Sequence, residues 1–156
     1  MSMLEAGQAA PDFSLPGDGE SKIRMEDFRG RKVVLYFYPK DDTSGCTQEA
    51  KEFSALKGDF AAAATEVLGM SADSAKSHDK FKAKYELDIR LASDEDHRVL
   101  EAYGVWGEKS MYGRKYFGVE RTTFLIDRKG TISRIWRKVK VPGHAAEVLE
   151  AARNLD

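Results

Sequence analysis

Short apolar runs alternate along the chain with segments of helical spacing. The most apolar run, residues 33–38 (VVLYFY), has the length and the β-branched and aromatic content of a strand buried on both faces. Residues 66–71 and 89–92 follow the same pattern, so we expect three buried strands, with a shorter strand around Phe13 and Leu15 near the start. Pro39 cannot donate to a β-ladder and ends the first buried strand.

Between these runs the apolar residues are spaced three or four apart, as in amphipathic helices. The first helix is predicted from about Cys46 to Ala63, loosened at Gly58. A second helix has inward residues at positions 78, 81 and 85 and is capped by Asp73 or Ser74. The remaining helices are expected through residues 99–103, capped by Ser93 or Asp94 and closed by Gly104, and through residues 145–152, starting near Pro142 and Gly143.

Residues 122–126 and 131–139 are predicted to form a hairpin through residues 127–130, in which Gly130 suits a positive φ. Strands that alternate with helices and end in a hairpin indicate an α/β sandwich. At 156 residues the chain is expected to form one domain, residues 1–156, with a single core.

Composition excludes several classes of function. A formal net charge of −1, with 33% of residues charged, gives no bias toward nucleic acid or an anionic membrane. No apolar stretch approaches a membrane span, and the first residues lack the pattern of a signal peptide, so we expect the cytoplasm. The single cysteine rules out a disulfide within the chain.

That cysteine, Cys46, is expected at the junction of a buried strand and a helix N-terminus, where free N–H groups and the helix dipole favour thiolate over thiol. A lone cysteine is more often a small buried hydrophobe. Here the preceding turn-forming residues and the following Thr47 and Gln48 are polar, and Gly45 allows close backbone approach. We therefore interpret Cys46 as a reactive thiol.

The segment around this cysteine resembles the active site of the peroxiredoxins, because Pro39, Thr43 and Cys46 match the motif Pro-x-x-x-Thr/Ser-x-x-Cys. The sequence of this segment is most similar to the bacterioferritin-comigratory, or Q-type, subfamily, and the likeness extends to residues 7–16, 67–74 and 118–127. The resemblance implies a thioredoxin-like fold with a central mixed β-sheet flanked by helices. It also implies an antioxidant thiol peroxidase that needs no cofactor and no metal.

By this resemblance, Cys46 attacks hydrogen peroxide or a small organic hydroperoxide and becomes a sulfenic acid. Thr43 supplies a hydroxyl to the bound peroxide, Pro39 shields the sulfur from water, and Arg121 contacts the sulfur and the peroxide oxygens. Glu49 either orients Arg121 or serves as a simple carboxylate at the helix start. Residues 106–118, rich in Gly, Tyr and charge, are expected to form a loop over this active face.

The chain departs from the subfamily at the positions where other members carry a resolving cysteine, because Lys51 and Lys82 stand there. Ser44 also replaces the usual proline. A sulfenic acid at Cys46 must then be reduced by an external thiol: thioredoxin, glutaredoxin or glutathione. If both lysines flank the entrance, they favour a glutathione-type donor. We expect a monomer.

Two other classes of cysteine enzyme do not fit the residues around Cys46. Thioredoxin-like disulfide reduction requires Cys-x-x-Cys, but the positions three residues before and after Cys46 hold Thr43 and Glu49. A cysteine phosphatase requires an arginine six residues after its cysteine, and that position holds Glu52. A redox sensor or chaperone-like binding protein that uses the same cysteine remains the alternative. The three histidines, His78, His97 and His144, have no metal-ligand spacing with Cys46 and are expected to be satisfied or exposed.

Overall fold

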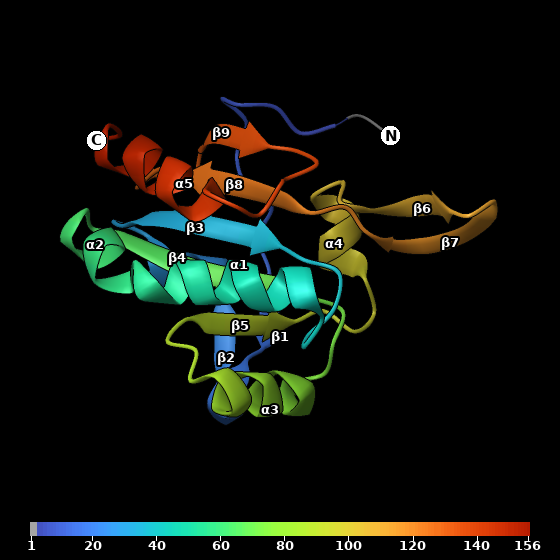
Figure 1. The fold of residues 1–156 in the computed structure, drawn as a ribbon. Coiled ribbons are helices and arrows are strands. Elements are labelled where there is room, and N and C mark those ends of the chain that lie inside the picture. The colour runs from blue at the N-terminus through green and yellow to red at the C-terminus, as the bar shows by residue number, and fades with distance from the viewer. Residues whose placement is uncertain (1–2) are drawn as a thin grey trace.

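Five strands form the central sheet of the computed structural model, which describes residues 3–156 (Figure 1). In sheet order they are β5 (Arg90–Ser93), β4 (Thr65–Ser71), β3 (Lys32–Phe37), β8 (Thr122–Ile126) and β9 (Ile132–Trp136). β3 pairs in parallel with β4 and antiparallel with β8, and β4 pairs in parallel with β5. The sheet is therefore mixed, and the three expected buried strands are confirmed.

Helices cover both faces of this sheet (Figure 1). They are α1 (Ser44–Ala55), α2 (Lys57–Ala62), α3 (Ala75–Tyr85), α4 (Arg98–Ala102) and α5 (His144–Arg153), with two 3₁₀ turns, η1 (Asp18–Glu20) and η2 (Met25–Phe28). The side chain of Ser74 caps α3 by accepting from the N–H of Ser77, and Gly143, at φ 79°, precedes α5. Both starts agree with the sequence.

The first predicted helix is divided in two. The break falls at Leu56 rather than at Gly58, because the N–H of Leu56 donates to the carbonyl of Phe53, three residues back, and ends α1 in a tightened turn. The ring of Phe53 in α1 lies 6.0 Å from the ring of Phe60 in α2. The break thus lets two aromatic residues from successive helices reach the same core.

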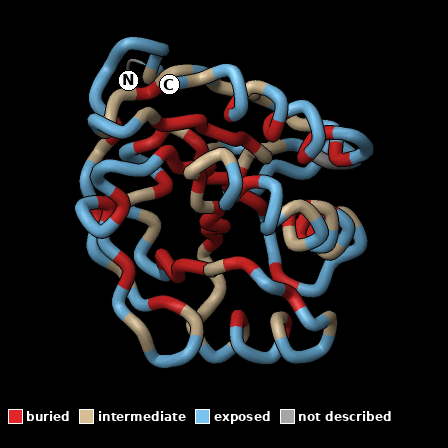
Figure 2. Tube along the Cα trace, turned by 90° about the vertical axis from the view of Figure 1, so that its left-hand side faces the viewer, coloured by how far each residue is buried: buried red, intermediate tan, exposed pale blue. Residues whose placement is uncertain are grey.

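Alternate residues of β3 face two separate cores. Val34 and Tyr36 pack with α1 and α5, whereas Leu35 and Phe37 pack with α4 and the N-terminal segment. All of β3 is buried, and buried residues concentrate in the middle of the molecule (Figure 2). This burial on both faces explains why the strand reads as a continuous apolar run.

Two small antiparallel ribbons complete the fold. β1 (Ser14–Pro16) pairs with β2 (Lys22–Arg24), and β6 (Trp106–Met111) pairs with β7 (Arg114–Val119). The second ribbon corrects the prediction of a loop over residues 106–118, and it extends away from the sheet (Figure 1). Its turn has positive φ at Tyr112 and Gly113, as two-residue hairpin turns require. Solvent on both faces of β7 removes the apolar alternation that would have revealed a strand.

The terminal hairpin of β8 and β9 is confirmed, and its turn has Gly130 at φ 86°. β9 ends at Trp136, three residues earlier than expected. Within residues 3–156, no helix combines the length and the apolar character needed to cross a membrane.

Candidate active site

Cys46 is the third residue of α1, directly after the loop that leaves β3. Its side chain is 1% exposed and packs in the core that contains Tyr36 and Ala50. The first backbone bond of α1 runs from the N–H of Thr47 to the carbonyl of Thr43, 2.8 Å away. The N–H groups of Gly45 and Cys46 precede that bond, so they belong to the unpaired first turn of the helix. The predicted junction of strand, turn and helix at the cysteine is thus present.

Arg121 lies in the short connection between β7 and β8, and its guanidinium reaches the sulfur. Nη2 donates to Sγ of Cys46 at 3.4 Å, and Nη1 donates to Oε1 of Glu49 at 2.6 Å. A Cβ at Gly45 would lie 3.2 Å from Nη2, so glycine leaves the space that the guanidinium uses. A cation therefore lies against the sulfur, in an orientation fixed by a fork of donors.

Glu49 lies one turn beyond Cys46 on α1, and its side chain is 1% exposed. Burial raises the pKa of this carboxyl from 4.5 to about 7, against the opposing effect of the Arg121 charge and hydrogen bond. Burial also disfavours charge on Arg121, but Glu49 and Cys46 outweigh it and raise the pKa of the guanidinium. Of the two roles left open by the sequence, the structure favours the one in which Glu49 orients Arg121.

Thr43 is the residue immediately before α1, and its hydroxyl donates to the carbonyl of Lys40 at 2.8 Å. Because the hydroxyl proton is used in that bond, the oxygen presents lone pairs that can accept a further hydrogen bond. Pro39 follows the β3 strand and is exposed. Its suggested role as a cover over the sulfur stays a prediction.

The two lysines at the family's resolving positions are both engaged with other side chains. Nζ of Lys51 lies 5.0 Å from the ring centre of Tyr85, and Nζ of Lys82 donates to Oδ2 of Asp18 at 2.7 Å. The charge of Lys82 is balanced by this carboxylate, which removes it from the argument for a glutathione-type donor. Of the two lysines, only Lys51 still supports the expected preference for glutathione over thioredoxin.

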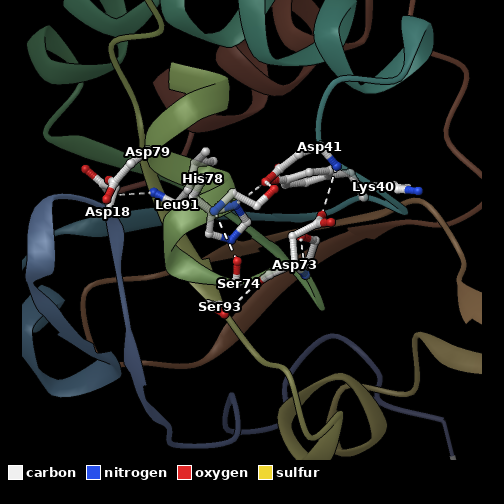
Figure 3. Close-up of polar contacts among 12 residues, drawn as sticks. Asp18, Lys40, Asp41, Asp73, Ser74, His78, Asp79, Leu91 and Ser93 are labelled. Atoms are coloured by element: carbon white, nitrogen blue, oxygen red, sulfur yellow. Dashed lines mark hydrogen bonds and ion pairs between the residues drawn. The ribbon is translucent and has the colours of Figure 1, made fainter. Parts of the chain in front are cut away.

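Two buried residues next to the site were not recognised from the sequence. Asp41, in the loop before α1, and His78, in α3, meet beneath that loop, with Oδ2 and Nδ1 2.7 Å apart (Figure 3). The available signal was the inward position of His78 on its helix, together with the place of Asp41 inside the cysteine motif. Sequence alone does not indicate that they meet, because they are 37 positions apart.

Comparison with known proteins shows the family to which this chain belongs. The model of the AhpC/TSA family matches residues 6–135. A "Putative peroxiredoxin bcp" of Coxiella burnetii is 53% identical over 146 residues, which cover 94% of this chain and 97% of that protein. The chain belongs to the AhpC/TSA family. Within it, the chain is a Bcp, or Q-type, peroxiredoxin.

Solved structures of Q-type peroxiredoxins have the same fold. A cysteine-to-serine mutant of Xylella fastidiosa PrxQ matches with a TM-score of 0.93 and 40% identity, covering 99% of this chain and 98% of that one. The Xanthomonas campestris bacterioferritin comigratory protein, in a study of its alkyl peroxide reduction activity, matches with a TM-score of 0.90 and 42% identity, covering 96% and 98%. The predictions of a thioredoxin-like fold and of a thiol peroxidase are confirmed.

Proposed function

We propose that Cys46 is the peroxidatic residue of this peroxiredoxin, with Arg121 and Thr43 as its catalytic partners. The observation that carries this assignment is the guanidinium of Arg121, shared between the sulfur of Cys46 and the carboxylate of Glu49. The thiolate attacks one peroxide oxygen, the O–O bond breaks, and Cys46 becomes a sulfenic acid. The other oxygen leaves with the electron pair of the broken bond and takes up a proton, giving water or an alcohol.

Ionisation of the cysteine explains only part of the rate that this reaction needs. A free cysteine, with a pKa of about 8.5, is roughly 3% thiolate at pH 7. Complete ionisation therefore gains only about 30-fold, or around 2 kcal/mol. Larger accelerations require stabilisation of the charge that moves onto the leaving oxygen. The donors of Arg121 and the unpaired N–H groups at Gly45 and Cys46 are suited to that task.

Thr43 and Pro39 complete the proposed site. Because the hydroxyl of Thr43 donates to Lys40, its oxygen accepts from the O–H of the attacked peroxide and holds that oxygen in line with the sulfur. Pro39 has no N–H and would limit the access of water to the loop. Its exposure in the structure makes this the weaker of the two assignments.

The proposed substrates are hydrogen peroxide and small organic hydroperoxides. The alkyl peroxide reduction activity of the related Xanthomonas campestris protein supports the second class. The 1% exposure of Cys46 favours small substrates, since a bulky hydroperoxide requires the loop before α1 to open.

We further propose that an external thiol completes the cycle, because the chain has one cysteine. Thioredoxin, glutaredoxin and glutathione are each adequate chemically. A compartment that keeps thiols reduced, such as the cytoplasm, would supply them. We propose a monomer as the functional unit, since Cys46, Arg121, Thr43 and Glu49 all come from one chain.

Peroxide consumption with dithiothreitol tests this function. The wild-type protein should consume many equivalents of hydrogen peroxide, whereas Cys46→Ser should consume none above background. Dimedone should trap one sulfenic acid per chain when one equivalent of peroxide is added without reductant. Consumption that stops after a single equivalent, with dithiothreitol in excess, would instead indicate a redox sensor.

A further inference from the structure

A buried polar cluster lies beneath the loop that connects β3 to α1, on the side of α3 (Figure 3). At its centre the ring of His78 is 0% exposed and the carboxylate of Asp41 is 4% exposed. Oδ1 of Asp41 accepts from the hydroxyl of Tyr38 at 2.6 Å, and Oδ2 accepts from the hydroxyl of Ser77 at 2.8 Å. None of these side chains belongs to the catalytic site proposed above.

The contacts of His78 favour a ring that is protonated on both nitrogens. Nε2 lies 2.9 Å from the carbonyl of Ala92, which can only accept, so Nε2 carries a proton. Nδ1 lies 2.7 Å from Oδ2 of Asp41. That carboxylate accepts from two hydroxyls, and a proton on Nδ1 would give it a third donor. This geometry suits an imidazolium at His78 that donates to the carboxylate of Asp41.

The surroundings of His78 are consistent with this charge. Burial acts against it most strongly, but Asp41, the carbonyl of Ala92 and the charge of Asp73 outweigh burial and raise the pKa of His78 above 6.5. Tyr38, at the end of β3, is the other titratable group that faces the ring. Burial, together with Asp41, raises the pKa of Tyr38 well above its usual value, so it remains a neutral donor.

Asp41 connects this ion pair to the hydroxyl of Thr43 through one peptide unit. The N–H of Asp41 donates to Oδ2 of Asp73 at 2.8 Å. The carbonyl of the same unit belongs to Lys40 and accepts from the hydroxyl of Thr43 at 2.8 Å. Rotation of this peptide would therefore move the hydroxyl proposed to hold the peroxide.

We propose that the His78–Asp41 pair positions the Lys40–Asp41 peptide and thereby the hydroxyl of Thr43 during the attack of Cys46 on peroxide. His78 is thus a positioning residue, and the inference rests on the role of Thr43 in the proposed function. It adds to that function a residue of α3 that touches neither the sulfur nor the substrate.

Two amide substitutions separate the contacts of His78. In His78→Asn the amide nitrogen occupies roughly the place of Nδ1, so the donor toward Asp41 is kept without a titratable proton. In His78→Gln the amide nitrogen takes roughly the place of Nε2, which keeps the contact with Ala92 and loses the one with Asp41. His97→Asn is the matched control, because His97 lies outside the cluster, at φ 66°, a conformation that asparagine tolerates.

The readout is the second-order rate constant for oxidation of Cys46 by hydrogen peroxide, measured without reductant. His78→Gln should lower it by about tenfold or more, whereas His78→Asn and His97→Asn should stay within about threefold of wild type at pH 7. In the background of Thr43→Val, His78→Gln should have less than about a threefold effect, because both changes act through one hydroxyl. Thermal melting of each variant tests that it remains folded.

The unmutated protein supplies a test that does not depend on folding of a variant. Nitrogen NMR of the ring, assigned by the signal that His78→Asn removes, should show both nitrogens protonated at pH 6, below the ordinary value of 6.5 above which this pKa is raised. As pH rises through the pKa of His78, the ratio of the wild-type rate to the rate of His78→Asn should fall.

The proposal would be overturned by a singly protonated ring at pH 6, by a ratio that stays constant while the ring loses its proton, or by an undiminished effect of His78→Gln beside Thr43→Val. A wild-type protein that fails to react with peroxide would refute the proposed function instead. A slow Thr43→Val variant beside an unaffected His78→Gln variant would refute only the positioning role.

Discussion

Nη1 of Arg121 lies 2.6 Å from Oε1 of Glu49, and this ion pair is almost removed from water, with the carboxylate 1% exposed and the guanidinium 17% exposed. The pair fixes the orientation in which Nη2 meets the sulfur of Cys46. Burying a carboxylate is unfavourable unless its charge is compensated. The contact is therefore expected to contribute more to the orientation of Arg121 than to the stability of the fold.

The first prediction concerns the pH dependence of stability. The pKa of Glu49 rises from 4.5 to about 7 on folding, so the folded protein binds more protons than the unfolded chain between these values. The free energy of unfolding should then decrease as pH rises through this window, by at most about 3 kcal/mol from this group. Glu49→Gln should lose this contribution. Urea unfolding of both proteins at pH 5 and pH 8 measures it, and equal changes would contradict the titration of Glu49.

Substitution of Arg121 should slow the oxidation of Cys46. Arg121→Ala removes a charge-assisted contact of roughly 2–4 kcal/mol in the transition state, equivalent to about 30- to 1000-fold in rate. Arg121→Lys keeps the charge but cannot donate to Cys46 and Glu49 with one planar group, so its rate should be intermediate. The measurement is single-turnover oxidation by hydrogen peroxide, with circular dichroism as the control for folding. A folded Arg121→Ala variant with wild-type rate would refute the assignment.

Substitution of Thr43 should change the rate of Cys46 oxidation much more than the free energy of unfolding. The hydroxyl makes no capping bond to α1 and donates instead to Lys40, so its loss should change the free energy of unfolding by no more than about 1 kcal/mol. Thr43→Val keeps the β-branched shape and loses the acceptor, so it should slow oxidation of Cys46, whereas Thr43→Ser should be tolerated. Parallel rate and urea measurements on both variants test this. Equal rates for valine and serine would exclude the hydroxyl from the reaction.

A further prediction concerns Asp18, which holds α3 and β5 together. Its carboxylate accepts from Lys82 and from the N–H of Leu91. Burial opposes its charge, but these contacts and Arg90 outweigh burial and lower the pKa of Asp18 below 3.8. Asp18→Asn should therefore cost about 1 kcal/mol at pH 7, a modest figure because the charged partners Lys82 and Arg90 are partly exposed.

The stability that Asp18 contributes is present above the unfolded pKa and disappears as pH falls through the folded value. Wild type and Asp18→Asn should thus converge in stability at strongly acidic pH. Urea unfolding at pH 7 and near pH 2 compares them, and Lys57→Met, which removes the exposed ion pair with Asp88, is the control. A difference between wild type and Asp18→Asn that is unchanged at the acidic pH would contradict the titration.

The sheet could be predicted because β3 and β4 are buried on both faces and leave continuous apolar runs in the sequence. The ribbon of β6 and β7 could not, because its exposed strands lack a buried face. The break at Leu56 also has no local signal, since leucine is a good helix former. It depends on the packing of Phe53 and Phe60. That residues 1–156 constitute one domain stays a prediction.

The residues of the site likewise divide into those that local sequence predicts and those that it does not. Local sequence placed Cys46 at the start of a helix, after a turn that contains Thr43, because the signals lie within a few residues. Family likeness supplied Arg121, which no local pattern would have singled out. The pairing of Glu49 with Arg121 was one of two roles left open by the sequence, and the structure favours it. The pairing of His78 with Asp41 depends on how distant elements cross, and it emerges only once the sheet order is known.

In the proposed cycle, the burial of Cys46, at 1% exposure, should separate its oxidation from its reduction in time. A peroxide is close to water in size and can enter through brief openings of the first turn of α1. The thiol of another protein needs a much larger opening before it can touch the oxidised sulfur. The oxidised chain should therefore persist for a short time after it has reacted with peroxide. With a protein thiol as the reductant, the lifetime of the oxidised chain should then depend on how often this helix frays, which is a property of the fold.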